Sequence, residues 1–108
     1  MSQSLDEFLR YSELLSLYYN LLSDTHREIL EDYFCYNLSF SEIAENRKIT
    51  RSSVEDAVKK GKRKLDEYED KLCSLKVLNL IHDVKANSSD EETNNKLDEI
   101  ERMMKHGI

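Results

Sequence analysis

The sequence predicts an all-α protein. Proline is absent and glycine occurs only twice in 108 residues, so few positions favour the tight turns that separate strands. Leu, Glu, Lys, Asp and Ser are frequent, whereas Val and Thr are few. Apolar residues recur at spacings of three and four along most of the chain, which is the helical period. With 39% hydrophobic and 35% charged residues, we expect these helices to enclose a small core.

The first expected helix spans roughly residues 5 to 22. Its apolar stripe contains Phe8, Tyr11, Leu15, Tyr18 and Leu22. Ser23 is a natural N-cap for a second helix over about residues 24 to 36, because its hydroxyl can accept a hydrogen bond from a free amide of the first turn. We expect this second helix to bury its own apolar stripe, which contains Ile29, Leu30, Tyr33 and Phe34.

Residues 39 to 58 predict two helices that are joined by a short connection and that each have their own N-cap. Ser39 and Glu42 form a capping box, and Thr50 caps the next start. Ala44 supplies a small residue where the two helices cross, and Ile49 is expected to seal the turn. This is the layout of a helix-turn-helix, in which the first residues of the second helix face base edges. The turn position that is usually glycine is Lys48, where a left-handed backbone costs about 1 kcal/mol or more.

A long helix is expected from Arg51, because no strong breaker follows for more than thirty residues and Gly61 is tolerable. Its apolar spacing alternates three and four, as in a coiled coil. Such a stripe is too long to be buried whole in a small domain, so some of it must meet the first helix or a second subunit, and we expect a homodimer. The predicted dimer seam consists of Leu65, Tyr68, Leu72, Leu75 and Ile81.

A polar break after residue 86 divides the expected helix-turn-helix domain, residues 1–86, from a C-terminal segment, residues 87–108. Ser89 and Glu92 predict another capping box, which would open a short final helix. That helix is thin in apolar residues and ends in a Gly107-Ile108 tail. Whether it packs on its own chain or on a partner is left open.

The basic charge is concentrated in the helix-turn-helix. The chain carries a net charge of −6, yet residues 47–64 hold eight basic and two acidic residues, 8 − 2 = +6, which leaves −12 for the rest. Phosphate contacts supply sequence-independent affinity, and Arg51 is suited to guanine. Glu55 and Asp56 on the same helix would repel phosphates. The candidate nucleic-acid-binding residues are Arg51, Ser52, Ser53, Lys59, Lys60, Lys62, Arg63 and Lys64.

Other function classes find little support. The three histidines have no partner spacing for metal binding or nucleophilic catalysis, and the two cysteines lack a Cys-x-x-Cys spacing, so we expect no catalysis, no metal and no cofactor. No apolar run approaches the ~20 residues of a membrane span. The first residues lack a basic segment followed by an apolar one, so we expect no signal peptide and a cytoplasmic location.

A series of short motifs carries a more specific resemblance. In order they are Leu22-Ser23, Arg27, Asp32-Tyr33-Phe34, residues 38–45, Thr50-Arg51, Val54, Asp56, Val58-Lys59, Leu65 and Tyr68-Glu69 with Lys71-Leu72. Over about residues 14 to 75 the chain resembles the YlxM family, small helix-turn-helix proteins related to region 4 of sigma factors. Ser52-Ser53 and Glu55 depart from the residues usual in that family.

The resemblance implies a bacterial cytosolic protein linked to the signal recognition particle pathway, without catalysis or cofactor. Three functions remain open. The chain could be an accessory factor that binds the particle's RNA or its GTPase. It could be a dimeric DNA-binding transcriptional regulator of the sigma-region-4 type. It could also be a protein-interaction module that binds no nucleic acid.

Overall fold

The computed structural model describes residues 5–106, and all the regular secondary structure within that range is helical, which confirms the predicted all-α class. The elements are α1 (Leu5–Tyr18), η1 (Tyr19–Leu21), α2 (Asp24–Phe34), α3 (Phe40–Arg47), α4 (Arg51–Leu72), α5 (Ser74–Asn87) and α6 (Glu91–His106). Two expectations concern residues outside this range. They are the tail at Gly107-Ile108 and the absence of a signal peptide, which involves residues 1–4. None of the described helices is both long and apolar enough to cross a membrane.

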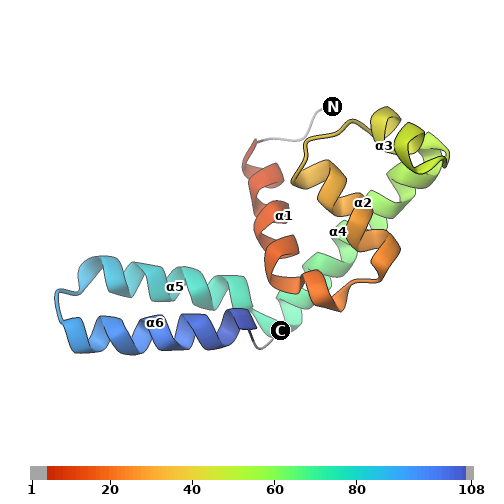
Figure 1. Ribbon diagram of the computed structural model, residues 1–108. Helices are drawn as coiled ribbons and strands as arrows, with labels where there is room; N and C mark the ends of the chain where they lie inside the picture. Colours follow the sequence, from red (N-terminus) through yellow and green to blue (C-terminus); the bar gives the residue numbers. More distant parts are fainter. Residues whose placement is uncertain (1–4, 107–108) are drawn as a thin grey trace.

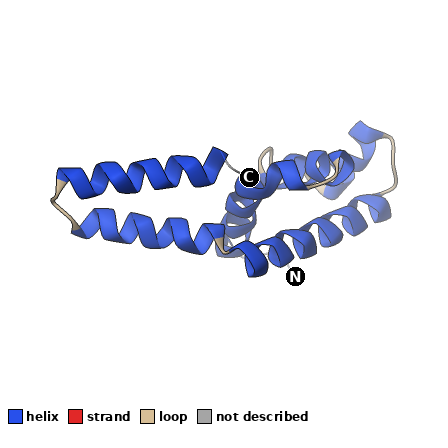
Figure 2. Ribbon diagram, turned by 90° about the horizontal axis from the view of Figure 1, so that it is seen from below, coloured by secondary structure: helices blue, strands red, loops and turns tan. Residues whose placement is uncertain are grey.

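The helices form two parts of unequal size. Helices α1 to α4 form a bundle, and α5 and α6 form an antiparallel hairpin that projects from it (Figure 1). The view from below shows the hairpin extending beyond the bundle, and the molecule measures 53 × 26 × 22 Å (Figure 2). The helix-turn-helix of α3 and α4 therefore lies far from the tip of the hairpin.

The core sits inside the bundle, where α1, α2, α3 and α4 meet. Its most deeply buried side chains are Tyr18, Leu14, Leu15, Leu30, Ile43, Leu65 and Val54. Three predicted caps begin the surrounding helices. The side chains of Ser23, Ser39 and Thr50 accept from the amides of His26, Glu42 and Ser53. The glutamate of the Ser39 capping box also accepts from the Ser39 amide at 3.0 Å, so this box is confirmed in full.

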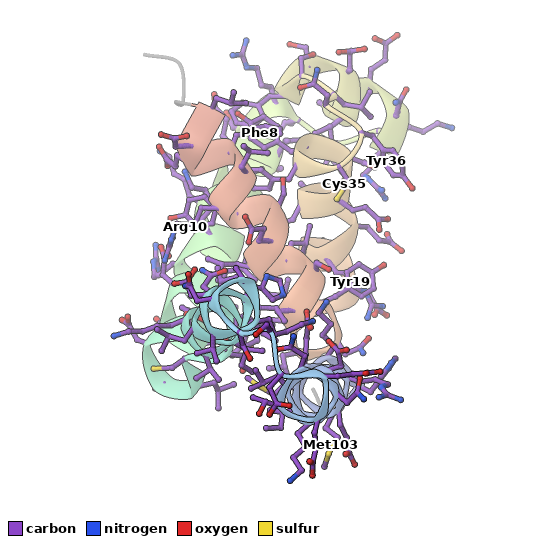
Figure 3. The ribbon with its side chains drawn as sticks, turned by 90° about the vertical axis from the view of Figure 1, so that its left-hand side faces the viewer. Phe8, Arg10, Tyr19, Cys35, Tyr36 and Met103 are labelled. Atoms are coloured by element: carbon purple, nitrogen blue, oxygen red, sulfur yellow. The ribbon has the colours of Figure 1, made fainter. Side chains whose placement is uncertain are left out.

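The Asp66 carboxylate of α4 binds two side chains of α1. Asp66 accepts from the Tyr11 hydroxyl and from the Arg10 guanidinium, both at 2.7 Å. Figure 3 shows Arg10 on the side of α1 that faces α4. Burial and the hydrogen bond to Asp66 raise the pKa of Tyr11 to about 12, so this phenol stays protonated and keeps donating. The expected contact between the long helix and the first helix is therefore present.

The unbroken helix of more than thirty residues is a wrong prediction. Helix α4 ends at Leu72, and Cys73 adopts a left-handed backbone with φ 55° before α5 begins. Glu69 accepts from the amides of Leu75 and Lys76, each at 3.1 Å, and thereby caps the new helix. The Ser74 amide donates to the Tyr18 hydroxyl at 3.2 Å. These acceptors come from other turns of the fold, so the break has no local signature in the sequence.

Ion pairs link α6 to α5 across the hairpin. Of the described α6 residues none is buried, and Glu101 faces His82 and Lys85 of α5 as well as Lys105 of its own helix. The capping box predicted at Ser89 and Glu92 is wrong, because α6 begins at Glu91 and Asp90 stands in the capping position. The Asp90 carboxylate accepts from the Thr93 hydroxyl at 2.5 Å. The hydrogen bonds from Thr93 and from the Glu92 amide lower the pKa of Asp90.

Candidate nucleic-acid interface

The helix-turn-helix is built as the sequence predicts, with one difference in the turn. Ala44 is buried at the crossing with α4, and Lys48 ends α3 in the left-handed conformation, φ 58° and ψ 44°. The Lys48 amide donates to carbonyls of the preceding turn, and the Ile49 amide donates to Ala44 O at 3.1 Å. The Ile49 side chain remains 39% exposed, so it does not seal the turn. Backbone hydrogen bonds close the turn instead.

Seven of the eight predicted nucleic-acid-binding residues are exposed on α4. They are Arg51, Ser52, Ser53, Lys59, Lys60, Arg63 and Lys64. The eighth, Lys62, is half-buried, since its ammonium pairs with Glu7 at 3.0 Å and lies 4.8 Å from the centre of the Tyr11 ring. Lys62 is therefore directed toward α1 and not outward. Arg47, the first cation of the basic segment, is likewise turned back and pairs with Asp32 and Glu28 of α2.

The acidic residues of the presumed reading helix are compensated within that helix. Glu55 lies 3.6 Å from Arg51, and Asp56 lies 3.0 Å from Lys60, both at the i, i+4 spacing. Such exposed pairs contribute little to stability, but they cancel charge locally. The first two turns of α4 are therefore nearly neutral. This pairing reduces the repulsion that the sequence alone predicted for Glu55 and Asp56.

The uncompensated charge lies farther along α4. At 100° per residue, five residues share the side of the helix opposite buried Val54, namely Ser52, Asp56, Lys59, Lys60 and Arg63. Asp56 pairs with Lys60 there, and we call the other four residues the basic face. Lys59 and Arg63 are exposed and form no ion pair with any other described residue. Two lone cations four residues apart can each approach one phosphate. The basic face is thus suited to contact a nucleic-acid backbone.

The five residues of the predicted dimer seam do not form one surface. Leu65 and Ile81 are buried inside the chain itself, and Leu75 is half-buried. The Tyr68 hydroxyl donates to Leu21 O at 3.0 Å, which fixes that side chain against the bundle. Only Leu72 is mostly open, at 51% exposure. The hairpin exposes more apolar side chains than this predicted seam does. They are Val77, Leu80, Val84, Ile100 and Met103.

A cavity of about 220 Å³ borders the basic face, and no sequence pattern predicted it. It is lined by Tyr33, Phe40, Glu55, Val58, Lys59 and Lys62. These residues come from α2, α3 and α4, so the cavity exists only once the three helices have packed. Tyr33 was expected to be a core residue, but both Tyr33 and Phe40 remain partly exposed. The packing of the three helices brings these two partly exposed rings next to two lysines, and the sequence alone does not reveal that arrangement.

Comparison with known proteins agrees with this architecture. Residues 5–105 match the model of the UPF0122 family, described as a helix-turn-helix protein, YlxM / p13 like. UPF0122 protein FN1394 of Fusobacterium nucleatum is 47% identical over 68 residues, which is 63% of this chain and 66% of the relative. UPF0122 protein MYPE4850 of Malacoplasma penetrans is 37% identical over 89 residues, 82% and 80% of the two chains. UPF0122 protein YlxM of Bacillus subtilis is 29% identical over 96 residues, 82% and 87% of the two chains.

Proposed function

The chain belongs to the UPF0122 family of YlxM- and p13-like helix-turn-helix proteins, and from this premise we propose that it is a regulatory protein that binds structured RNA through α4. The observation that carries the proposal is the basic face, where Lys59 and Arg63 are exposed and pair with no acidic residue among those that the structure describes, in a chain of net charge −6. The remainder of the chain is acidic in sum and therefore disfavours phosphates. We accordingly place the main phosphate contacts on this helix.

RNA suits this face better than a DNA major groove does. A groove-reading helix uses the side chains of its first turns, but here the Glu55 carboxylate faces Arg51 and the Asp56 carboxylate is exposed beside it. Two carboxylates at that end would lie close to the phosphates that border a DNA groove. The unpaired cations lie one to two turns farther on, where they would contact backbone phosphates. Structured RNA is recognised largely through phosphates and shape.

The resemblance to the YlxM family supplies a specific RNA for the proposal. It implies a place in the signal recognition particle pathway, so we take the particle's RNA as the ligand and the cytoplasm as the site of action. The regulatory role is that of an accessory factor without chemistry of its own. The GTPase of the particle is the alternative partner, and the exposed apolar residues of the hairpin favour it.

Binding measurements over a range of salt concentrations test the proposal. Fluorescence anisotropy should show tighter binding to the particle's RNA than to random RNA or duplex DNA, with affinity falling steeply as salt rises. Lys59→Ala/Arg63→Ala should weaken binding and reduce the salt slope by about 2. The matched control is Lys71→Ala/Lys76→Ala, which removes two exposed lysines outside the basic face and should leave the slope unchanged.

Other outcomes would select the competing functions. Preference for one DNA sequence would indicate a transcriptional regulator of the sigma-region-4 type and contradict the RNA proposal. Absence of nucleic-acid binding at low salt, beside binding to the GTPase, would indicate a protein-interaction module.

The homodimer is a separate proposal, which now rests on Leu72 and the apolar residues of the hairpin. Light scattering of the wild type and of Leu72→Asp tests it, since a wild-type monomer contradicts it.

A further inference from the structure

The cavity of about 220 Å³ beside the basic face combines the chemical groups that recognise an unstacked base. Its aromatic wall consists of Tyr33 and Phe40, whose ring centres lie 4.9 Å apart with their planes tilted by 31°. Both rings are partly exposed, so each leaves part of its surface for a further ring. Nucleobases that leave a helical stack bind in proteins by stacking on such side chains.

The size of the cavity limits what it can accept. Pockets for drug-sized ligands begin near ~300 Å³, and this cavity is smaller. One flat ring system fits such a space better than an extended ligand does. Buried Val58 adds an apolar surface to the lining. A single base is therefore the part of an RNA that matches the cavity.

Charges around the cavity suit the rest of a nucleotide. Lys59 belongs both to the cavity lining and to the basic face, so a base in the cavity would remain connected to phosphates on α4. Lys62 also contributes to the lining, but its ammonium already pairs with Glu7. Lys59 is thus the cation available for the phosphate of the bound nucleotide.

Glu55 provides a hydrogen-bond acceptor in the same lining. The closest approach of its carboxylate to Arg51 is 3.6 Å, longer than a hydrogen bond, and it accepts no hydrogen bond from any other described residue. A carboxylate is suited to accept from an exocyclic amino group such as that of cytosine. It repels the carbonyl oxygen that uracil presents at the same position. The acidic side chain that appeared unfavourable for DNA binding thus acquires a role toward a base.

We propose that the cavity lined by Tyr33, Phe40, Glu55 and Lys59 binds one unpaired nucleobase that carries an amino group, so that the protein recognises bulged or looped RNA. The inference rests on the proposed RNA-binding function and deepens it. A fully paired duplex keeps its bases stacked and cannot fill the cavity. Phosphate contacts on the basic face would then supply general affinity, and the cavity would select the position.

The test uses the full chain and three RNA hairpins that differ at one position, with a bulged cytidine, a bulged uridine or no bulge. We expect the bulged cytidine to bind at least about fivefold tighter than the paired hairpin, as stacking of one base provides. It should bind about tenfold tighter than the bulged uridine, as one hydrogen bond to a charged group provides. Equal affinity for all three hairpins would overturn the inference while leaving RNA binding intact.

Two variants assign the effect to the cavity. Phe40→Leu should remove the preference for a bulge, whereas Tyr36→Leu, which alters an aromatic residue that is 65% exposed outside the cavity, should retain it. Glu55→Ala should abolish the discrimination between cytidine and uridine and leave the preference for a bulge. Because Glu55 is partly exposed, this variant remains informative even if Phe40→Leu fails to fold. Discrimination that survives in Glu55→Ala overturns the role of Glu55, and no binding of any hairpin overturns the proposed function itself.

Discussion

The hydroxyl of Tyr18 donates to Oε1 of Glu69 at 2.7 Å, and these two side chains together bind the first amides of α5. Tyr18 is fully buried in the bundle core, whereas Glu69 belongs to the next-to-last turn of α4. Burial and the hydrogen bond to Glu69 raise the pKa of Tyr18, which keeps the phenol protonated. The pair therefore connects the core of the bundle with the start of the hairpin.

We predict that Glu69→Ala frees the start of α5. The amides of Leu75 and Lys76 lose their acceptor, so their hydrogen exchange should accelerate, and stability should fall by about 1 kcal/mol, as for a lost cap. Amides in α3 should retain their protection. Glu67→Ala, an exposed glutamate on the same helix, is the control and should change neither quantity. Unchanged exchange at Leu75 in Glu69→Ala would show that the capping contact is unimportant.

Gly61→Ala should destabilise the bundle, although alanine favours a helix by about 1 kcal/mol. A methyl group at Gly61 would lie 2.5 Å from Cδ1 of Leu30, which is fully buried and would have to shift within the core. Overpacking of this kind costs about 1–3 kcal/mol. Urea unfolding of Gly61→Ala, compared with Lys60→Ala on the exposed side, measures the difference. A gain in stability at position 61 would mean that Leu30 can move aside.

Lys48→Gly should stabilise the protein by about 1 kcal/mol, since glycine adopts the left-handed turn without the steric penalty of a side chain. For a chain of this size we expect the thermal midpoint to rise by about 4–8 °C. Lys59→Gly is the matched control, because the same substitution in the middle of α4 should lower stability by about 1 kcal/mol. Destabilisation by both variants would indicate that the Lys48 side chain stabilises the turn through contacts of its own.

Acid should weaken the hairpin through Glu101. The hydrogen bond with His82, aided by Lys105, lowers the pKa of Glu101 to about 2 from its ordinary value of 4.5. A carboxyl whose pKa is lowered by folding stabilises the fold above its unfolded pKa, and that contribution is lost as pH falls toward the folded pKa. The stability difference between wild type and Glu101→Gln should therefore be present at pH 5.5 and shrink by pH 2.5. Glu99→Gln, on an exposed position of α6, should show no such change.

The parts of the fold that depend on neighbours in sequence could be predicted. Ser23, Ser39 and Thr50 each bind an amide three residues ahead, so their residue types and spacing were sufficient. The break at Cys73 could not be predicted, because the amides that follow it bind a phenol 56 residues before Ser74 and a carboxylate in the preceding helix. Sequence patterns report which residues favour a helix, but not which distant oxygen replaces its hydrogen bonds.

The candidate site divides in the same way. Exposure of Lys59 and Arg63 followed from the helical period, because both stand opposite the buried stripe. The inward direction of Lys62 and Arg47 did not follow, since it depends on Glu7 of α1 and Asp32 of α2. The cavity was equally hidden, because its rings come from two other helices. The number of basic residues in a sequence segment therefore exceeds the number of cations that remain available to a binding partner.

One left-handed residue, Cys73, joins α4 to α5, so a small change of angle at this residue moves the far end of the hairpin by a larger distance. Helix α5 has 14 residues, so its far end lies about 21 Å from Cys73 at ~1.5 Å per residue. A rotation of about 10° at that joint displaces the far end by about 4 Å, the width of one side chain, over that ~21 Å arm. Small adjustments near Tyr18 and Glu69 are thus magnified at the loop that joins α5 to α6, far from the helix-turn-helix.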